Sequence, residues 1–352
     1  MTRNTGKLIP ALFCMFIFLL TATSPALARD ASEKDGNDPF TPGFSGYIRP
    51  MVGIGYSKSQ TDVGDDNERI DSLDQDAESE TDFIPMIFWN MGYTLENGTT
   101  RFFAGSSEDS VIDSISFLEV GIQQKLLNGT VLSAAYIPGI PGLEDEVWAD
   151  PYLLGSNRSE TDREAHAFRV AAESLFGTAL SFNYGFGTQD IDTDQAGLYL
   201  SQQPGSTLTT SDLNDLKRSG DFHRAQVLYA FQLGENTMLE PGLTYTRGDA
   251  DGDANSFDKF GGQISLTTAM DRCRLFTTLE LAHAEYDQSN PVFDKTRKQW
   301  EYSAVIGAGY MAPFGYEDFM VNIFTGFTKK DANIKFYDST ALIGGVGITW
   351  MF

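Results

Sequence analysis

The chain has 352 residues, and its 49 Asp and Glu residues outnumber 25 Lys and Arg residues, which gives a formal charge of −24. Such an acidic balance excludes a nucleic-acid-binding protein, because that class needs a basic surface to displace counterions from phosphates. The 26 Phe, 14 Tyr and 4 Trp residues also exclude a disordered chain, since disordered sequences are poor in aromatic residues.

The first 28 residues have the three parts of a secretory signal peptide. Arg3 and Lys7 form a positive start, residues 8–20 form an apolar run, and Ala26-Leu27-Ala28 forms a small-residue cleavage site. The run of 13 residues is shorter than the roughly 20 residues of a membrane-spanning helix. We therefore expect cleavage after residue 28, a short N-terminal segment at 29–43, and a single domain at 44–352.

Cleavage leaves Cys273 as the last cysteine, so the mature chain is expected to have no internal disulfide. Cys14 lies inside the apolar run, and Leu12-Phe13 before it lacks the small residue of a lipidation site.

The rest of the chain alternates apolar with polar or small residues in short runs, as β-strands with two different faces do. Ile48, Val52, Ile54 and Tyr56, for example, alternate with Arg49, Met51, Gly53, Gly55 and Ser57. In chain order, this pattern predicts fourteen strands, at 48–57, 87–95, 100–106, 118–122, 130–137, 165–176, 180–187, 227–233, 239–245, 260–266, 275–281, 302–310, 319–327 and 346–352.

The connections between these strands alternate in length. Short turns are predicted at 97–98, 128–129, 176–178, 234–236, 271–272 and 313–315, and long polar connections at 61–82, 138–163, 190–220, 248–258 and 287–299. Two of the turns are Asn-Gly, which is typical of tight hairpins. Outer-membrane barrels have this asymmetry, with short periplasmic turns and long outer loops.

The C-terminus alternates in the same way and ends on an aromatic residue. Val346, Ile348, Trp350 and Phe352 resemble the terminal strand that the barrel assembly machinery of the outer membrane recognises. An ordinary final strand with an interfacial aromatic residue is the alternative.

These patterns predict an all-β protein, a transmembrane antiparallel β-barrel of about 14 strands, with 12 to 16 possible. In lipid every backbone amide must be paired within the protein, and strands achieve this only in a closed barrel. A soluble β-sandwich is the alternative. The expected location is the outer membrane of a Gram-negative bacterium, in contact with lipid and lipopolysaccharide.

One face of the predicted strands carries polar and charged residues that would line the lumen. They are Arg49, Asn90, Glu119, Arg169, Glu173, Asn183, Glu240, Glu280, Glu301 and Asn322. On the lipid face, a Lys or Arg at mid-depth would cost roughly 2–4 kcal/mol. These residues either line a cation-favouring pore or pair with one another as a plug, and the sequence leaves both open.

Three of the outer loops invite functional interpretations. In the 138–163 loop, Trp148, Asp150 and Tyr152 suggest a segment that folds into or over the barrel mouth as a constriction, or that packs only for stability. The 61–82 loop has a net charge of −9 and suits divalent cations or cationic solutes, although a solvated loop bridged to lipopolysaccharide is favoured.

The third loop has the alternating acidic residues of a calcium loop. Asp249, Asp251, Asp253, Asn255 and Asp258 would be its oxygen ligands, but Ala254 and Phe260 replace the Gly and Glu of a helix-loop-helix site. A looser Ca²⁺ site is the remaining possibility, and no other cofactor is expected.

Enzymatic activity is not expected. Gly43-Phe44-Ser45-Gly46 departs from the nucleophile elbow by one residue. Outer-membrane lipases exist on barrels, and His166, His223 and His283 are the candidate bases here, but no serine stands out as their partner.

Several motifs together resemble an uncharacterised family of Gram-negative outer-membrane proteins, the domain of unknown function numbered 2860. The motifs are Gly43-Phe44-Ser45-Gly46-Tyr47-Ile48, Ile70-Asp71-Ser72-Leu73, Trp148-Ala149-Asp150-Pro151-Tyr152-Leu153, Arg158, Thr161-Asp162, Gln189-Asp190-Ile191-Asp192 and Arg247-Gly248-Asp249-Ala250-Asp251-Gly252-Asp253-Ala254-Asn255. The resemblance spans the mature chain. It implies location and architecture, but no activity, ligand or catalytic residue.

The sequence thus favours a porin-like channel for small solutes, with the loops at 138–163 and 190–220 as its constriction and the lumen glutamates as its selectivity. The alternative is a non-conducting surface or structural protein that binds a partner or divalent cations through its acidic loops.

Overall fold

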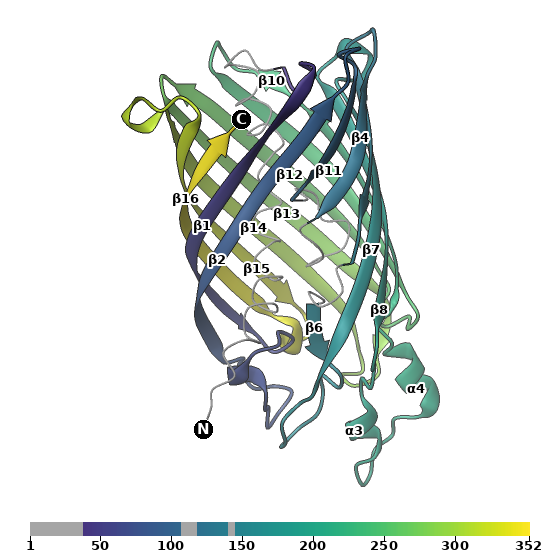
Figure 1. The fold of residues 1–352 in the computed structure, drawn as a ribbon. Coiled ribbons are helices and arrows are strands. Elements are labelled where there is room, and N and C mark those ends of the chain that lie inside the picture. The colour runs from purple at the N-terminus through teal and green to yellow at the C-terminus, as the bar shows by residue number, and fades with distance from the viewer. Residues whose placement is uncertain (1–37, 107–117, 140–144) are drawn as a thin grey trace.

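The computed structural model describes residues 38–106, 118–139 and 145–352, and these residues form one closed antiparallel β-barrel (Figure 1). Fourteen strands make the wall, which confirms the predicted fold and strand number. They are β1 (Gly43–Ser59), β2 (Ser79–Thr94), β3 (Thr100–Gly105), β4 (Glu119–Lys125), β5 (Val131–Ile137), β7 (Glu160–Glu173), β8 (Leu180–Ile191), β9 (Gly220–Tyr229), β11 (Thr237–Ala250), β12 (Phe257–Met270), β13 (Cys273–Asn290), β14 (Lys295–Met311), β15 (Phe319–Ala332) and β16 (Ser339–Met351).

Two short strands are added to this wall. β6 (Asp145–Trp148) pairs with the start of β7, and β10 (Phe231–Gln232) pairs with β11. Among the described residues, no helix has the length and hydropathy needed to cross a bilayer.

The barrel closes because its first and last strands pair with each other. β1 and β16 are antiparallel from Tyr47 opposite Met351 to Ser59 opposite Ser339. Around the rest of the wall each strand pairs with its neighbours in the chain, and β9 joins β11 directly. The first and last strands therefore do not remain as open edges of the sheet, and closure of this kind is the condition for strands to lie in lipid.

The two faces of the wall differ in exposure. Outward-pointing apolar side chains such as Ile54 and Phe83 are 63% and 69% exposed, whereas the residues next to them, Gly53 and Ile84, are buried. The same alternation runs along all the long strands. A continuous band of exposed apolar side chains around a barrel is the surface that lipid covers.

The two ends of the barrel have different connections. At the turn end, uppermost in Figure 1, short turns join the strands, and Gly98 and Gly129 adopt positive φ angles that glycine takes without strain. At the loop end, lowermost in Figure 1, lie the long connections, including α3 (Leu198–Ser201) and α4 (Thr210–Asp215). Thr209 and Asp212 form a capping box that fixes the start of α4.

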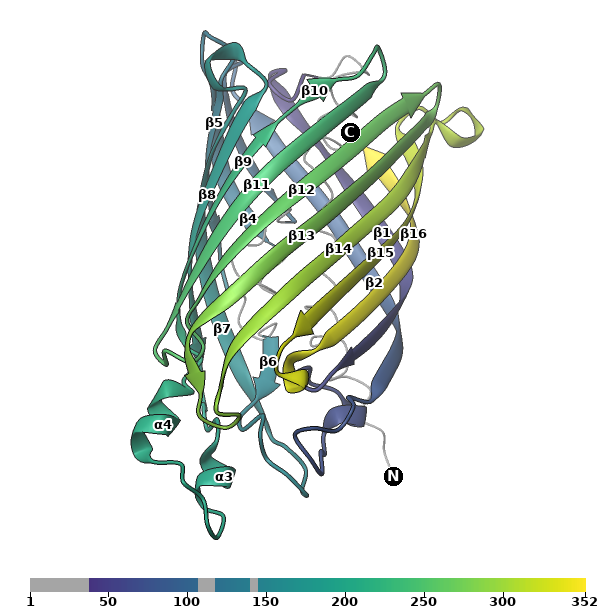
Figure 2. The same ribbon diagram turned by 180° about the vertical axis from the view of Figure 1, so that it is seen from behind.

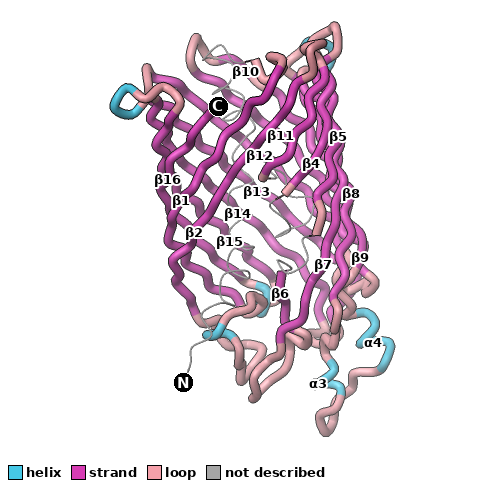
Figure 3. Tube along the Cα trace, viewed as in Figure 1, coloured by secondary structure: helices cyan, strands magenta, loops and turns pink. Residues whose placement is uncertain are grey.

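Several strands extend further toward the loop end than the sequence predicts. β13 and β14 continue to Asn290 and from Lys295, so their connection is only 291–294 instead of the predicted 287–299. Pairing continues beyond the apolar band, where both faces are polar and the alternation that predicts strands is absent. In the view from behind, where the loop end is lowermost, β13 and β14 run down past the ends of β15 and β16 (Figure 2). The tube view shows the loops and the helices α3 and α4 gathered at that same end (Figure 3).

Candidate functional site

All ten residues that the sequence places in the lumen occupy inward-pointing positions of their strands. Arg49 follows the parity of the buried Met51 on β1, and Glu301 follows that of the buried Val305 on β14. The same parity applies to Asn90, Glu119, Arg169, Glu173, Asn183, Glu240, Glu280 and Asn322.

Two of the inward-pointing glutamates form ion pairs with bases on other strands along the inner face of the wall. Arg169 on β7 and Glu119 on β4 are 2.8 Å apart, and Lys259 on β12 and Glu301 on β14 are 3.2 Å apart. All four side chains are largely buried. Pairing removes much of the negative potential that these carboxylates would otherwise contribute to the lumen.

A polar belt lies on the inner wall near the turn end. It includes the predicted lumen residue Arg49 and two arginines that were not predicted, Arg101 and Arg274. Arg101 on β3 donates to Gln123 (3.0 Å) and to Asn90 (3.1 Å). Arg49 donates from Nε to the Thr349 hydroxyl (2.8 Å).

The belt continues from Thr349 around the wall. Asn322 on β15 donates to the Thr349 hydroxyl (2.7 Å). In the strand register Gly309 on β14 lies opposite both Asn322 and Arg274 on β13, so Arg274 is at the same level of the wall as Asn322. Parity would have revealed the two missed arginines, since Arg101 and Arg274 each directly precede an outward-pointing apolar residue, Phe102 and Leu275.

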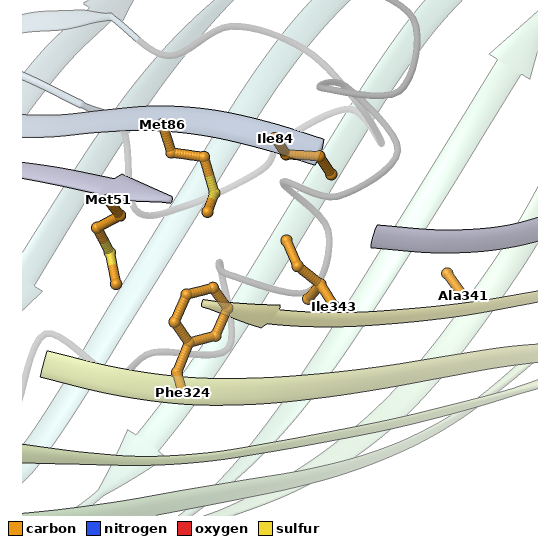
Figure 4. Close-up of a cluster of buried hydrophobic side chains, with 6 residues drawn as sticks. All are labelled: Met51, Ile84, Met86, Phe324, Ala341 and Ile343. Atoms are coloured by element: carbon orange, nitrogen blue, oxygen red, sulfur yellow. The ribbon is translucent and has the colours of Figure 1, made fainter. Parts of the chain in front are cut away.

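An apolar patch adjoins this belt on the side toward the loop end (Figure 4). Met51 (β1), Ile84 and Met86 (β2), Phe324 (β15), and Ala341 and Ile343 (β16) form one buried cluster, with Phe88 and Phe276 packed against it. The interiors of outer-membrane barrels are usually polar. Inward-pointing Met and Phe therefore depart from the common pattern, and no apolar patch was predicted from the sequence.

Glycines beneath the rings of this patch let the rings lie along the wall. A Cβ at Gly307 would stand 2.2 Å from the Phe276 ring, and one at Gly345 would stand 2.8 Å from the Phe324 ring. Any larger residue at either position would push the ring toward the barrel axis. The two glycines thus leave room for the rings against the inner wall.

At the loop end, five connections meet in one apolar cluster, which we call the loop cap. Its buried members are Ile70, Tyr152, Ala196, Leu216, Ile334 and Phe336, with Leu73, Leu154, Leu200, Val292, Phe293 and Tyr337 packed against them. The β1–β2 and β8–β9 connections stand six strands apart on the barrel. Because residues from opposite sides of the rim are in contact, the loop cap extends across the mouth.

The three predicted constriction residues belong to this part of the structure. Trp148 is 1% exposed and donates from its indole nitrogen to the carbonyl oxygen of Asp62 (3.0 Å). The Asp150 carboxylate accepts from the backbone N–H groups of Tyr152, Gly197 and Tyr199 at 2.9–3.0 Å. It therefore ties the 149–159 segment to the start of α3.

Arg158 clamps two connections of the loop cap together. Its guanidinium donates to the carbonyl oxygens of Gln60 (2.8 Å), Pro151 (3.1 Å) and Asn67, and it lies 4.4 Å from the centre of the Trp148 ring. Burial lowers the pKa of Arg158 to about 10. A planar cation with several donors can satisfy carbonyls from two loops at once, which a lysine cannot do.

The acidic 61–82 region is partly strand, because β2 begins at Ser79. Within its loop, burial raises the pKa of Asp62 to about 6, while a hydrogen bond from Ser59 and the charge of Lys330 oppose that rise. One carboxylate oxygen of Asp62 is buried without a hydrogen-bond partner.

The structure does not bring the five predicted calcium ligands together. β11 and β12 extend to Ala250 and from Phe257, so Asp249 and Asp258 lie in strands, where both contact Arg247. Asp253 accepts from Gln288 (2.9 Å), and Asn255 donates to the carbonyl oxygens of Leu216 and Lys217. Within the described ranges, no group of three or more His, Cys, Asp or Glu side chains is placed to hold a metal ion.

The three histidines lie on the outward face near the loop end, among aromatic side chains. His166 bonds to the Tyr136 hydroxyl (2.9 Å), His223 bonds to the Tyr184 hydroxyl (2.7 Å), and His283 packs against Trp300 at a centroid distance of 4.4 Å. Aromatic rings in this position form the interfacial girdle of a membrane barrel.

The C-terminal residues lie as the sequence predicts for a final strand. Val346, Ile348 and Trp350 are exposed on the outward face of β16. Phe352 exchanges two backbone hydrogen bonds with Gly46, at 2.9 and 3.0 Å, and its ring stacks on Phe44.

Comparison with solved structures gives matches to outer-membrane proteins. OmpT of Vibrio cholerae with loop L8 deleted is 12% identical with a TM-score of 0.42, and the match covers 88% of this chain and 99% of that one. A mutant of the monoaromatic hydrocarbon channel TodX is 10% identical with a TM-score of 0.44, and covers 90% and 93%. At these values the similarity concerns barrel architecture and does not extend to solutes.

Among curated proteins, no sequence match was found. The profile of a family described as protein of unknown function (DUF2860) matches residues 43–351, which is the whole barrel from the first residue of β1 to the last residue of β16. The chain therefore belongs to the DUF2860 family.

Proposed function

We propose that this barrel lies in the outer membrane of a Gram-negative bacterium and lets small solutes pass. The observation that supports this most directly is the strand number. Eight strands enclose a space that wall side chains just fill, and the interior widens with each added strand. A closed wall of fourteen strands is thus wider than its own side chains fill, and two of its inward rings lie against glycines of the wall.

In this proposal the turn end faces the periplasm and the loop cap faces outward. The loop cap restricts entry, because connections from opposite sides of the rim meet across the mouth. The outward surface contacts lipid and lipopolysaccharide, and the C-terminal strand is the signal for the barrel assembly machinery.

The alternative is a non-conducting surface or structural protein, and the ion pairs in the lumen favour it. Glu119 and Glu301 are neutralised by Arg169 and Lys259, as expected of a barrel that closes its interior with charge pairs. The remaining predicted lumen glutamates, Glu173, Glu240 and Glu280, would then serve the same purpose.

Conductance in planar bilayers tests the proposal. We would compare the refolded mature protein with Arg158→Lys, which loosens the loop cap, after checking the fold of each by its heat-modifiable migration in gels. We expect stepwise currents for both proteins and larger ones for Arg158→Lys. Correctly folded barrels that are silent in both forms would overturn the channel and support the alternative.

A further inference from the structure

We propose that the inner wall near the turn end holds a binding site for a small organic anion with an apolar body, such as an arylalkanoate. The site consists of the arginines of the polar belt and the apolar patch beside them. This inference rests on the proposed function and names the class of solute.

The arginines of the belt are buried positive charges that a bound anion would stabilise. Arg101 and Arg274 are only 8% and 6% exposed, and the Nε of each is buried without a hydrogen-bond partner. Among the ion pairs found in the described residues, none involves Arg49, Arg101 or Arg274. Arginine stays protonated in proteins, and a buried charge is costly unless it is paired.

The charge balance of this region favours anions. The sequence left open whether the lumen glutamates favour cations or pair with bases, and Glu119 and Glu301 are paired with bases. Near the turn end, three arginines instead share a belt with the uncharged Asn90, Gln123, Asn322 and Thr349. An anion entering on this side of the lumen meets three arginines that form no ion pair with the described residues.

The apolar patch begins at a constant offset from the belt. On four strands the belt residue and the patch residue are two positions apart on the inward face, and the patch residue is always nearer the loop end. The pairs are Arg49 with Met51, Asn90 with Phe88, Arg274 with Phe276, and Asn322 with Phe324. Two residues along a strand span about 7 Å. A molecule whose carboxylate is held by a guanidinium of the belt therefore places a ring carried one or two carbons away beside the patch.

The side chains of both parts suit such a molecule. A guanidinium binds a carboxylate through two parallel N–H donors. Met51, Met86 and the rings of Phe276 and Phe324 offer sulfur and aromatic surfaces to an apolar body. A sugar lacks the charge, inorganic phosphate lacks the apolar body, and an amine has the wrong sign.

Calorimetric titration of the folded, detergent-solubilised mature protein tests the site without requiring passage. The probes are phenylacetate, its cationic counterpart 2-phenylethylamine, and acetate. We expect phenylacetate to bind at least tenfold more tightly than either of the others. The double variant Arg101→Gln/Arg274→Gln should weaken phenylacetate binding at least tenfold, and Phe324→Ala should weaken it to a smaller extent.

The matched control is Arg69→Gln, which removes an exposed arginine of the β1–β2 connection and should leave phenylacetate binding unchanged. If the double variant does not fold, the test uses the two single arginine variants instead. The ranking of the three probes on the unaltered protein also tests the site. Equal binding of phenylacetate and 2-phenylethylamine, or binding that is unchanged by the arginine substitutions, would overturn the inference.

Swelling of liposomes that contain the protein, with arabinose as the uncharged solute, separates the two proposals. If arabinose enters but phenylacetate does not bind, the anion site is wrong and the channel stands. If phenylacetate binds as expected but neither arabinose nor phenylacetate causes swelling, the site stands and the channel is wrong.

Discussion

The hydroxyl oxygens of Tyr152 and Tyr337 lie 2.6 Å apart in the loop cap, although 185 residues separate them in the chain. Asn290, the last residue of β13, donates to both hydroxyls, at 3.2 and 2.9 Å, so the end of a strand joins the same contact. Burial raises the pKa of both tyrosines, and the hydroxyls therefore stay protonated. A buried polar contact among two connections and a strand end fixes how they meet, which apolar packing alone does less specifically.

Tyr337→Phe removes one hydroxyl and leaves two buried partners without it. An unsatisfied buried polar group costs about 1–3 kcal/mol, while the ring itself keeps its place beneath Arg297, whose guanidinium carbon lies 3.9 Å from the ring centre. We expect faster hydrogen exchange at residues 150–154 and 334–338, measured by mass spectrometry. Tyr316→Phe at the exposed turn end is the control, and unchanged exchange at 150–154 would show that the hydroxyl contact does not hold the loops.

Arg158→Lys retains the positive charge but cannot reach the three carbonyl oxygens at once. The variant should lose the bonds to Gln60 and Asn67 or the bond to Pro151, together with much of the stacking on Trp148. We expect a loss of about 1–3 kcal/mol in the local stability of the 60–78 connection, because carbonyls remain buried without donors. Proteolysis at this connection, compared with Arg69→Lys at an exposed site, measures the loss, and equal cleavage rates would contradict the clamp.

Asp62 makes the same connection sensitive to pH. Its pKa is about 6 in the folded protein against an ordinary value of 3.8, so between these values the folded loop binds more protons than an open loop does. The stability of the loop is therefore highest at low pH and falls as pH rises toward about 6, by up to about 3 kcal/mol.

Asp62→Asn should remove this dependence and slow exchange in residues 60–70 at pH 7.5 relative to the unaltered protein, after correction for intrinsic exchange. Asp71→Asn, at an exposed carboxylate of the same connection, is the matched control. A pH dependence that survives in Asp62→Asn would place its origin elsewhere.

Much of the wall could be predicted because a strand has a period of two. Once a short turn fixes where a strand begins, parity assigns every side chain to one face, which is why Arg49 and Glu301 occupy inward positions as expected. Arg274 was missed because it precedes the apolar run by one residue. Met51 was placed on the same face as Arg49, but an apolar patch of Met51 and Phe324 was not predicted, because apolar residues are not expected inside such a barrel.

The loop cap could not be predicted, since its contacts join segments that are distant in the chain. Trp148 and Tyr152 indicated only that their loop must pack somewhere. Their partners, such as Asp62 and Tyr337, are set by which connections the closed barrel brings together, and no local pattern records that.

The pair of Lys259 and Glu301 predicts a specific asymmetry in stability. Removing one member of a buried ion pair costs about 3–5 kcal/mol, because the other charge is left unpaired, whereas replacing both with apolar residues can be nearly neutral. Lys259→Met should therefore destabilise the barrel in urea unfolding from lipid vesicles, and Lys259→Met/Glu301→Leu should recover most of the loss. A double variant as unstable as the single one would mean that Lys259 acts through other neighbours.

Phe352 separates the stability of the final strand from its recognition during assembly. Its backbone bonds to Gly46 survive in Phe352→Ala, and the variant loses only the ring that stacks on Phe44 at 5.7 Å and packs against Trp350 at 5.1 Å. Phe44→Ala removes the same stacked pair from the other side while keeping the terminal aromatic residue. If the ring is read by the assembly machinery, Phe352→Ala should lower the folded yield in cells several-fold, Phe44→Ala should not, and both should refold equally well in detergent. Equal losses in cells for the two variants would instead assign the effect to the stacking itself.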